Sequence, residues 1–295
     1  PCSPPGIRPE RVPRTIRRPA ARPAASFDGD SRGEIAEMHG AGNTGGAEHR
    51  MRVRLITLGC DKNTVDNEYL AAMLEDAGCT ILSGEAVDSS AFADVVVVTT
   101  CGFIGDAKRQ SIEMLLNFAD RKRETGRPAR IYAAGCLAQR YAGELLREIP
   151  EIDGIVGVGQ FERLAQMIRK GKGGNAVKAA PAVAVCRFLR RRRLDNHPYA
   201  FLKIADGCNH ACTFCAIPLM KGRLHSVSRD ILLREARTLL DSGARELNLI
   251  AQDISVYGMD RKSGPRLPQL LRDLCALEGD FWIRCLYCYP GGVTN

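Results

Sequence analysis

The sequence predicts an α/β protein in which two series of parallel strands alternate with helices. From residue 51 onward, an apolar strand, a cysteine just after it and an amphipathic helix form a repeating unit. A second series of strands and helices begins near residue 198, after a segment rich in glycine, proline and arginine. Strands that alternate with helices form right-handed crossovers on a parallel sheet, so both series are expected to fold in this way.

The first series delivers three cysteines that are far apart in sequence. Each expected strand ends shortly before one of them: Val53–Leu58 before Cys60, Val95–Val98 before Cys101, and Arg130–Ala134 before Cys136. Between the strands, apolar residues recur at helical spacing, which predicts a helix after Cys60 and another after Cys101. Because the carboxyl ends of parallel strands share one edge of the sheet, we expect the three cysteines to converge there.

The segment at residues 173–197 is expected to link two domains, because glycines, Pro181 and an arginine run interrupt the pattern. The second series is expected to contain strand Tyr199–Ile204, helix Asp230–Leu240, strand Glu246–Ile250, a helix around Leu267 to Leu274, and strand Phe281–Tyr287. The predicted domains are therefore residues 51–172 and residues 198–295.

Residues 1–50 differ in composition from the rest of the chain. They are rich in Pro, Gly, Ala and Arg without a sustained apolar period, so disorder or a non-native extension is expected, with Met51 as the true start. No stretch approaches the roughly 18 apolar residues of a membrane span, and no apolar signal peptide is expected. The 12 cysteines therefore indicate metal-bound thiolates in a reducing compartment rather than a disulfide scaffold.

The net charge of +8 is concentrated in one place. Five of the positive charges come from a short run in the linker: Arg187, Arg190, Arg191, Arg192 and Arg193. The remainder of the chain is close to balanced, so the whole surface is not expected to be a basic platform. Two interpretations of the run stay open, a solvated linker or a contact with RNA or an acidic surface.

Three further cysteines lie close together in the second series. Cys208, Cys212 and Cys215 form a C-x3-C-x2-C motif in the loop after a strand, with Gly207 before them to permit a tight turn. Such a loop can place three thiolates on three irons of a four-iron, four-sulfur cluster, which leaves the fourth iron open. A zinc site is the alternative, but zinc favours four ligands in paired C-x2-C motifs. His210 inside the loop is expected to be a spacer.

The remaining cysteines are distinguished by their position. A lone cysteine is more often a small buried hydrophobic residue than a ligand. Cys60, Cys101 and Cys136 share one expected sheet edge, however, and three thiolates there would hold a second cluster with one open iron. Cys285 and Cys288 are expected to lie on opposite faces of an apolar strand, in place of aliphatic residues. No function is assigned to Cys2, Cys79, Cys186 and Cys275.

The C-x3-C-x2-C motif, with the aromatic Phe214 just before its last cysteine, resembles the radical S-adenosylmethionine (SAM) superfamily. The resemblance implies that the open iron binds the amino and carboxylate groups of SAM. It also implies that the three cysteines are catalytic, because their cluster supplies the electron that cleaves SAM to a 5′-deoxyadenosyl radical. By the same resemblance, backbone around Phe214 contacts the adenine, and Gln252 and Asp253 lie near the methionyl end of SAM. A polar strand terminus is the alternative for these last two.

Longer segments extend the resemblance. They are LGCDKNTVDNE at Leu58–Glu68, TTCGFIGDAK at Thr99–Lys108, AGC at Ala134–Cys136 and LKIADGCNHACTFCAIPLMKG at Leu202–Gly222, and together they are similar to the methylthiotransferases. The similarity spans Met51 to the end of the chain. Within that family, CGFI, AIPLMKG, LIAQDISVYG and WIRCLYCYP resemble the enzymes that modify an aspartate of a ribosomal protein more than those that modify tRNA adenosine.

The resemblance implies an enzyme with two 4Fe-4S clusters, the second of them held by Cys60, Cys101 and Cys136, and with SAM used twice. One SAM would methylate a sulfur held on the second cluster. The radical from another SAM would remove hydrogen from the β-carbon of an aspartate in small-subunit ribosomal protein S twelve, and the carbon radical would capture the methylthio group. The implied partners are this ribosomal protein, a low-potential electron donor and ribosomal RNA, and the implied location is the cytoplasm. A tRNA-adenosine methylthiotransferase and an inactive, truncated iron-sulfur protein are the alternatives.

The sequence also departs from the family pattern. The radical SAM core of the family is a partial barrel of six β/α units followed by a small TRAM domain, whereas about three units are expected here and no TRAM segment follows them. A truncated partial (β/α) barrel is therefore expected, with strand Phe281–Tyr287 as an unpaired apolar edge. Such an edge and an incomplete SAM pocket would lower stability and activity.

Overall fold

The computed structural model describes residues 50–82, 93–178, 190–262 and 266–292. By its backbone contacts the chain divides into two units, Pro1–Arg50 and Met51–Asn295, and all the elements below belong to the second unit. The prediction of disorder for residues 1–49 lies outside the described residues, as does Arg187 of the arginine run. In the described residues, no helix combines the length and the apolar character needed to cross a lipid bilayer.

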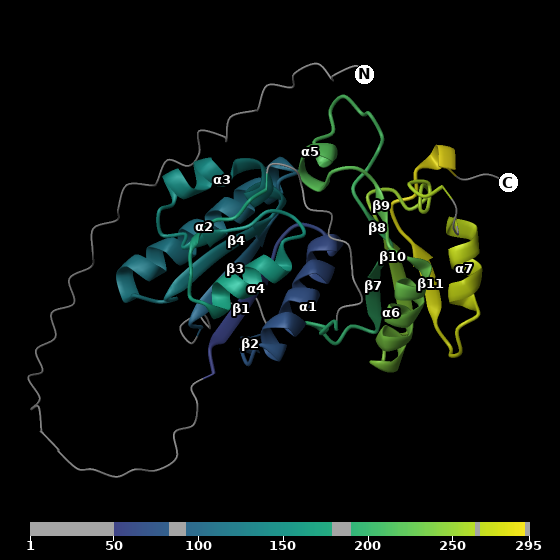
Figure 1. The fold of residues 1–295 in the computed structure, drawn as a ribbon, viewed down its shortest axis with the longest axis horizontal. Helices are drawn as coiled ribbons and strands as arrows, with labels where there is room; N and C mark the ends of the chain where they lie inside the picture. Colours follow the sequence, from purple (N-terminus) through teal and green to yellow (C-terminus); the bar gives the residue numbers. More distant parts are fainter. Residues whose placement is uncertain (1–49, 83–92, 179–189, 263–265, 293–295) are drawn as a thin grey trace, which may run out of the picture. The chain divides into compact units, whose positions relative to one another are not determined.

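A parallel sheet of six strands forms the first part of the described chain (Figure 1). Its strands are β1 (Arg52–Thr57), β2 (Thr80–Leu82), β3 (Val95–Thr100), β4 (Arg130–Gly135), β5 (Gly154–Ile155) and β6 (Gly174–Asn175). Their spatial order is β2-β1-β3-β4-β5-β6, and Val95 lies opposite Val53 on one side and Arg130 on the other. Strand β3 is central and buried on both faces, which explains its run of β-branched Val and Thr.

Helices cover both faces of this sheet (Figure 1). They are α1 (Asp61–Asp76), α2 (Gly105–Thr125), α3 (Cys136–Glu148) and α4 (Phe161–Arg169). On one face, Leu70 and Leu74 of α1 and Leu164 of α4 pack against Val53 and Val97 of the strands. Helices α2 and α3 lie on the opposite face, toward which the alternate residues of each strand point. The predicted alternation of parallel strands and helices is thus confirmed.

Helix α1 packs against two layers at once. Its residues Val65 and Tyr69 belong to a second apolar cluster, together with Leu202 and Leu247 of the other sheet. Because both sides of α1 are covered, polar residues that a surface helix would expose, such as Glu68, are buried. These polar side chains must therefore find their partners inside the protein.

The second part of the described chain is a parallel sheet of three strands in the order β11-β10-β7. The elements are β7 (Tyr199–Lys203), β8 (Ala205–Asp206), α5 (Ile217–Lys221), β9 (His225–Ser226), α6 (Arg229–Asp241), β10 (Glu246–Ile250), α7 (Leu267–Cys275), β11 (Trp282–Cys285) and the 3-10 helix η2 (Pro290–Gly292). Leu232 and Leu239 of α6 and Leu270 and Leu274 of α7 join the apolar cluster of this sheet. The predicted α/β class with parallel sheets is confirmed for both parts.

The last expected strand is shorter in the structure than in the prediction. Strand β11 ends at Cys285, because Tyr287 adopts a φ of 61°, a left-handed conformation that cannot continue a strand. Cys288 therefore lies beyond the strand, and both Cys285 and Cys288 are exposed. The expectation that these two cysteines occupy opposite faces of an apolar strand is wrong.

Several short elements were not predicted. They include α4, the hairpin of β8 and β9, and α5, which follows the cysteine loop. Strand β6 extends the first sheet into residues 174–175, the start of the expected linker. The domain boundaries at residues 172 and 198 stay a prediction.

Candidate functional site

The three cysteines of the first series lie at the carboxyl edge of the six-stranded sheet. Cys60, Cys101 and Cys136 follow β1, β3 and β4, which are neighbours in that sheet. A Cβ atom at Gly59 would lie 2.5 Å from the Cβ of Cys101, and one at Gly102 would lie 2.9 Å from the carbonyl carbon of Cys136. The structure therefore brings the three cysteines together at the edge where their strands end.

Polar side chains link the ends of these three strands. The amide group of Asn67 donates to the hydroxyl of Thr57 at 2.7 Å and accepts a hydrogen bond from the hydroxyl of Thr99 at 2.6 Å. The hydroxyl of Thr100 donates to the carbonyl of Ala134 at 2.6 Å. Because β1 is linked to β3 and β3 to β4 in this way, the cysteines that follow the strands are held at fixed positions.

Two of these cysteines stand at the start of helices. Cys60 is the residue before α1, and Cys136 is the first residue of α3. The N-terminus of a helix carries a partial positive charge, which favours the thiolate form. Burial nevertheless raises the pKa of the Cys136 thiol to about 12, although the ammonium group of Lys221 lowers it. Such a thiol binds a metal only with loss of its proton, which the metal itself drives.

The second set of cysteines lies in the loop between β8 and α5. Gly207 begins the loop with a φ of 75°, and a Cβ atom there would lie 2.1 Å from the carbonyl oxygen of Arg223, so the turn requires glycine. The amide of Cys208 donates to the carbonyl of the residue after α5 at 3.1 Å, which closes the loop. Cys212 is exposed, whereas Cys208 and Cys215 are partly buried.

His210 does more than separate the cysteines of the loop. Its Nε2 lies 2.7 Å from Oδ2 of Asp253, and its backbone amide donates to Sγ of Cys208 at 3.4 Å. Asp253 also accepts hydrogen bonds from the hydroxyl of Ser255 at 2.6 Å and from the amide of Tyr289 at 3.3 Å. Burial raises the pKa of the Asp253 carboxyl, but these hydrogen bonds outweigh it and hold the pKa below its ordinary value. The expectation that His210 is only a spacer is wrong.

The other residues predicted to contact SAM differ in exposure. The side chain of Gln252 hydrogen-bonds to Asp206, and its Oε1 is buried without a partner among the described residues. Phe214 is 87% exposed, next to the last cysteine of the loop. A buried oxygen without a protein partner and an exposed aromatic ring both suit a ligand at this place. The roles of these residues toward SAM stay predictions.

Helix α5 joins the two sets of cysteines. It follows Cys215 after one residue, and its Met220 packs in one buried cluster with Cys136 and Val158. Ala216, just before the helix, packs against the same cluster. Because α5 is only five residues long, the loop that carries the second set lies beside the first set.

The candidate donor atoms of both sets are thiol sulfurs, which as thiolates bind zinc or iron-sulfur clusters. Across the described ranges, no group of three or more Cys, His, Asp or Glu side chains is arranged to hold one metal ion. A 4Fe-4S cluster spreads its thiolates over separate irons, whereas a structural zinc ion gathers four ligands around one centre. Each set offers three thiols, the number that a 4Fe-4S cluster with one open iron takes.

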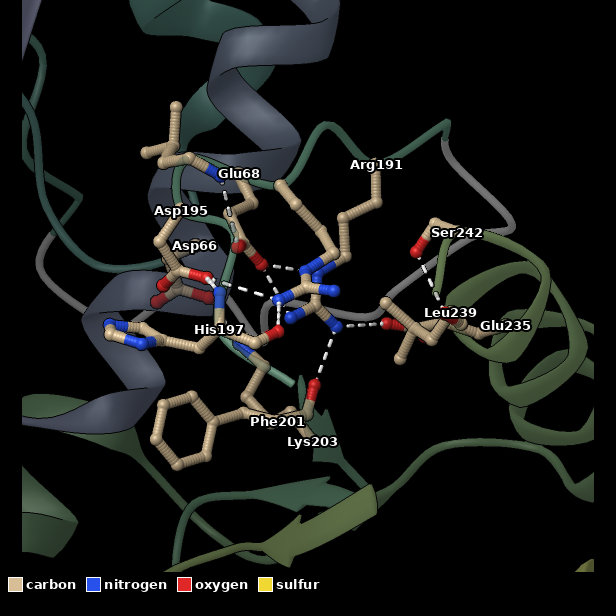
Figure 2. A network of polar contacts seen from close by, with 12 residues as sticks. Asp66, Glu68, Arg191, Asp195, His197, Phe201, Lys203, Glu235, Leu239 and Ser242 are labelled. Carbon is tan, nitrogen blue, oxygen red and sulfur yellow. Dashed lines mark hydrogen bonds and ion pairs between the residues drawn. The ribbon is translucent and has the colours of Figure 1, made fainter. Parts of the chain in front are cut away.

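Arg191 links helix α1 to α6 and β7 through a buried network of polar contacts (Figure 2). Its guanidinium group is 4% exposed, and its Nε lies 2.5 Å from Oε2 of Glu68 on α1. One terminal nitrogen lies 2.7 Å from Oε1 of Glu235 on α6 and donates to the carbonyl of Phe201 on β7 at 2.6 Å. Burial lowers the pKa of Arg191, but the two carboxylates outweigh it and raise the pKa further. The solvated-linker interpretation is therefore wrong for Arg191.

The other described arginines of the run also contact their own chain. Arg190 and Arg192 pair with the carboxylate of Glu75 on α1 at 3.1 and 2.5 Å. Arg193 pairs with Asp195 at 3.1 Å. Four positive charges of the run thus have acidic or carbonyl partners within the protein, and a contact with RNA stays a prediction.

Sequence reasoning missed a buried group of charges close to the two sets of cysteines. Its members are Asp66, Lys203, Asp206 and Lys221. Charged residues on a helix or at a strand end ordinarily face solvent, so the hydrophobic pattern gave no sign of it. The available signal was Lys203, a charged residue within an otherwise apolar strand directly before the cysteine motif.

Similarity to known proteins agrees with these features. Residues 52–157 match the model of the Uncharacterized protein family UPF0004. Over 245 residues, or 82% of the chain, the sequence is 45% identical to ribosomal protein uS12 methylthiotransferase RimO of Desulforudis audaxviator (strain MP104C), of which 53% is covered. The RimO proteins of Thermoanaerobacter sp. (strain X514) and Thermotoga maritima are 42% and 44% identical over 82% and 83% of the chain, with 55% of each relative covered. The chain thus spans about half the length of these curated relatives.

Similarity to solved structures is weaker. The structure of TsrM from Kitasatospora setae, described as a radical S-adenosylmethionine methyltransferase with cobalamin and a [4Fe-4S] cluster bound, matches with a TM-score of 0.49 and 15% identity. The match covers 70% of this chain and 50% of that chain. Such a score is too low to establish a shared fold.

Over its aligned residues, the chain is related to the methylthiotransferases, and the resemblance predicted from its motifs is confirmed. Within that family, the relatives reported above are the ribosomal protein uS12 methylthiotransferases named RimO.

Proposed function

We propose that this chain is a radical SAM methylthiotransferase that adds a methylthio group to the β-carbon of an aspartate in small-subunit ribosomal protein uS12. One observation carries the proposal: α5 joins two sets of three cysteines, and each set offers the ligands of a cluster with one open iron. The names of the relatives supply the substrate, since they are called uS12 methylthiotransferases.

The two sets divide the work of holding the cofactors. The loop cysteines Cys208, Cys212 and Cys215 would hold the cluster that binds SAM, and Cys60, Cys101 and Cys136 would hold the auxiliary cluster. When bound, the clusters and SAM supply the radical and sulfur-transfer chemistry. The chain would position them through α5, whose Met220 packs on Cys136 in a buried cluster. A reactive radical must be shielded from other hydrogen donors, and this buried contact supports such shielding on one side of the first set.

The proposed SAM contacts follow from the polar groups near the loop. Gln252 would contact the methionyl end of SAM through its buried Oε1, and backbone around Phe214 would contact the adenine. The carboxylate of Asp253 already binds His210, Ser255 and an amide, so its part is to fix the loop beside the methionyl end. These contacts would orient SAM for its cleavage, and none of the three residues would take part in the chemical step itself.

The domain organisation and the partners are part of the same proposal. Residues 51–172 would form the auxiliary-cluster domain, 173–197 the linker, and 198–295 a part of a radical SAM (β/α) barrel; the parallel order of β7, β10 and β11 supports the last. A low-potential electron donor and a cytoplasmic location follow from the cluster chemistry and from a ribosomal substrate. Contact with ribosomal RNA would need arginines of the run other than Arg191, which is buried.

The test is anaerobic reconstitution with iron and sulfide, followed by incubation with SAM, a low-potential reductant and uS12. Mass spectrometry should find a methylthio group on an aspartate of uS12, together with 5′-deoxyadenosine. Replacement of Cys212 with Ala should abolish both products. Methylthio-adenosine in tRNA with unmodified uS12 would assign the substrate to tRNA instead, and bound zinc without iron would contradict the enzyme class.

A further inference from the structure

Four buried charged residues that pair with one another lie close to the two sets of cysteines, and a further buried cation, Lys62, stands two residues after Cys60. Lys203 and Lys221 are 1% and 4% exposed. The Nζ of Lys221 lies 3.5 Å from Oδ2 of Asp66 and 3.6 Å from Oδ2 of Asp206. Lys203 pairs with the same two carboxylates. Two ammonium groups and two carboxylates balance each other, which makes their burial tolerable.

These charges come from the chain segments that carry the cysteines. Asp66 belongs to α1, which begins directly after Cys60. Asp206 stands two residues before Cys208 at the end of β8. Lys221 is the last residue of α5, the helix that packs on Cys136. The charge group therefore ties the cysteine loop to the helix that starts at the first set.

Lys221 is the member of this group that acts on the first set. Burial lowers its pKa, but the carboxylates of Asp206 and Asp66 outweigh burial and raise the pKa well above its ordinary value, so the side chain is positively charged. The charge of Lys221 in turn acts on the thiol of Cys136. Lys221 directly follows Met220, which packs on Cys136, and it pairs with Asp66 on the helix that begins after Cys60, so its positive charge lies beside the first set of cysteines.

The hydrogen-bonding capacity of Lys221 is only partly used. Its two carboxylate contacts at 3.5 and 3.6 Å are longer than a charged hydrogen bond, which is about 2.7–2.9 Å. Oδ2 of Asp206, one of these two partners, is buried and makes no hydrogen bond within the described residues. An ammonium group with three donors and such loose partners can also interact with sulfur at the first set.

We propose that Lys221 is a positioning residue that holds a positive charge beside the cluster of Cys60, Cys101 and Cys136 and thereby raises its reduction potential. The inference rests on the proposed function, because it needs a cluster at these cysteines. A nearby positive charge stabilises the reduced, more negative state of a cluster, and net charge and hydrogen bonds to sulfur are among the factors that set its potential. Through Asp66 and Asp206 the same side chain also holds the two sets side by side.

The test uses the full chain with Cys208, Cys212 and Cys215 replaced by Ala, so that only the first set can hold iron. In this background, a redox titration followed by electron paramagnetic resonance gives the midpoint potential for Lys221→Met, Lys221→Arg and Lys203→Met. Lys203→Met is the matched control, because Lys203 is as buried as Lys221 and pairs with the same carboxylates but lies on β7. No substrate or turnover is needed.

The expected result is a more negative potential for Lys221→Met, a potential near that of the background for Lys221→Arg, and a smaller shift for Lys203→Met. Equal shifts for the two Met variants, or no shift, would overturn the role of Lys221 and leave the proposed function standing. A background protein that binds no iron would overturn the proposed function and the inference with it. Lys221→Gln, checked by circular dichroism, provides the neutral variant if Lys221→Met does not fold.

Discussion

The environment of each cysteine separates a candidate ligand from a residue that only packs. Cys79 and Cys136 are similarly buried, at 9% and 7% exposure. Cys79 lies among aliphatic residues in the apolar cluster of the first sheet. Cys136 instead starts a helix at the sheet edge and interacts with the charge of Lys221. Burial alone therefore does not distinguish them, nor does a nearby cation, since Arg169 acts on Cys79 as Lys221 does on Cys136; position at the sheet edge does.

Gly102 is predicted to be essential for the geometry of the first set. Gly102→Ala would place a Cβ atom 2.9 Å from the backbone of Cys136, so the loop after Cys101 must shift, at a cost of about 1–3 kcal/mol. Gly105→Ala is the control, because no atom lies within 4 Å of a Cβ there. Urea denaturation should show a loss of stability for the first variant alone, with reduced iron uptake on reconstitution. Equal stability of the two variants would contradict this close approach.

The convergence of the cysteines could be predicted from sequence, but their polar surroundings could not. Parallel strands end at one edge, so Cys60, Cys101 and Cys136 had to approach one another wherever the strands were correctly placed. The bond between His210 and Asp253 joins residues 43 apart, and the pair of Lys203 and Asp66 joins residues 137 apart. No local pattern specifies such partners, because they depend on the packing of separate elements.

At the scale of elements, α1 shows how a helix can be predicted correctly and its surroundings missed. The spacing of Leu70 and Leu74 predicts the face that packs on the six-stranded sheet. The opposite side packs on the second sheet through Val65 and Tyr69. Charged residues of α1 such as Asp66 and Glu68 are therefore buried and contact other residues inside the protein, although their spacing along the sequence is typical of a solvent-facing helix surface.

Helix α7 is predicted to depend on its inner apolar face. Leu274 is fully buried in the cluster of the three-stranded sheet, so Leu274→Ala should lower the free energy of unfolding by about 2–5 kcal/mol through lost contacts and a cavity. Gln269→Ala on the exposed side of the same helix should change it by less than about 0.5 kcal/mol. Denaturant titration of the two variants measures the difference. A similar effect for both would mean that α7 does not pack as described.

At the scale of the whole molecule, the arginine run is a structural joint between two sheets within residues 51–295. The position of the run in the sequence predicted a linker between domains. Its positive charge suggested that the arginines are exposed to solvent or contact RNA or an acidic surface. Arg191 instead joins α1, α6 and β7 in one buried network (Figure 2). Charge density in a sequence could not reveal this, because the acidic partners lie on helices far along the chain in both directions.

Loss of Arg191 is predicted to destabilise this joint strongly. Arg191→Met would leave the buried carboxylates of Glu68 and Glu235 without their cation, at a cost of about 3–5 kcal/mol. Arg192→Met, which removes a partly exposed pair with Glu75, should cost about 0–1 kcal/mol. Chemical denaturation of the two variants gives the comparison. An unchanged m-value, the slope of the free energy of unfolding against denaturant concentration, checks that unfolding remains two-state. Equal losses would show that burial of Arg191 has no energetic consequence.

The central claim is that two neighbouring sets of three cysteines each hold one iron-sulfur cluster. The most direct measurement is iron and sulfide content per chain after anaerobic reconstitution, for the parent protein and for three variants. Replacing Cys60, Cys101 and Cys136 with Ala should remove about half of the iron, replacing Cys208, Cys212 and Cys215 should remove the other half, and Cys79→Ala should remove none. Iron content that is unchanged by either triple replacement, or a parent protein that binds zinc in place of iron, would contradict the account.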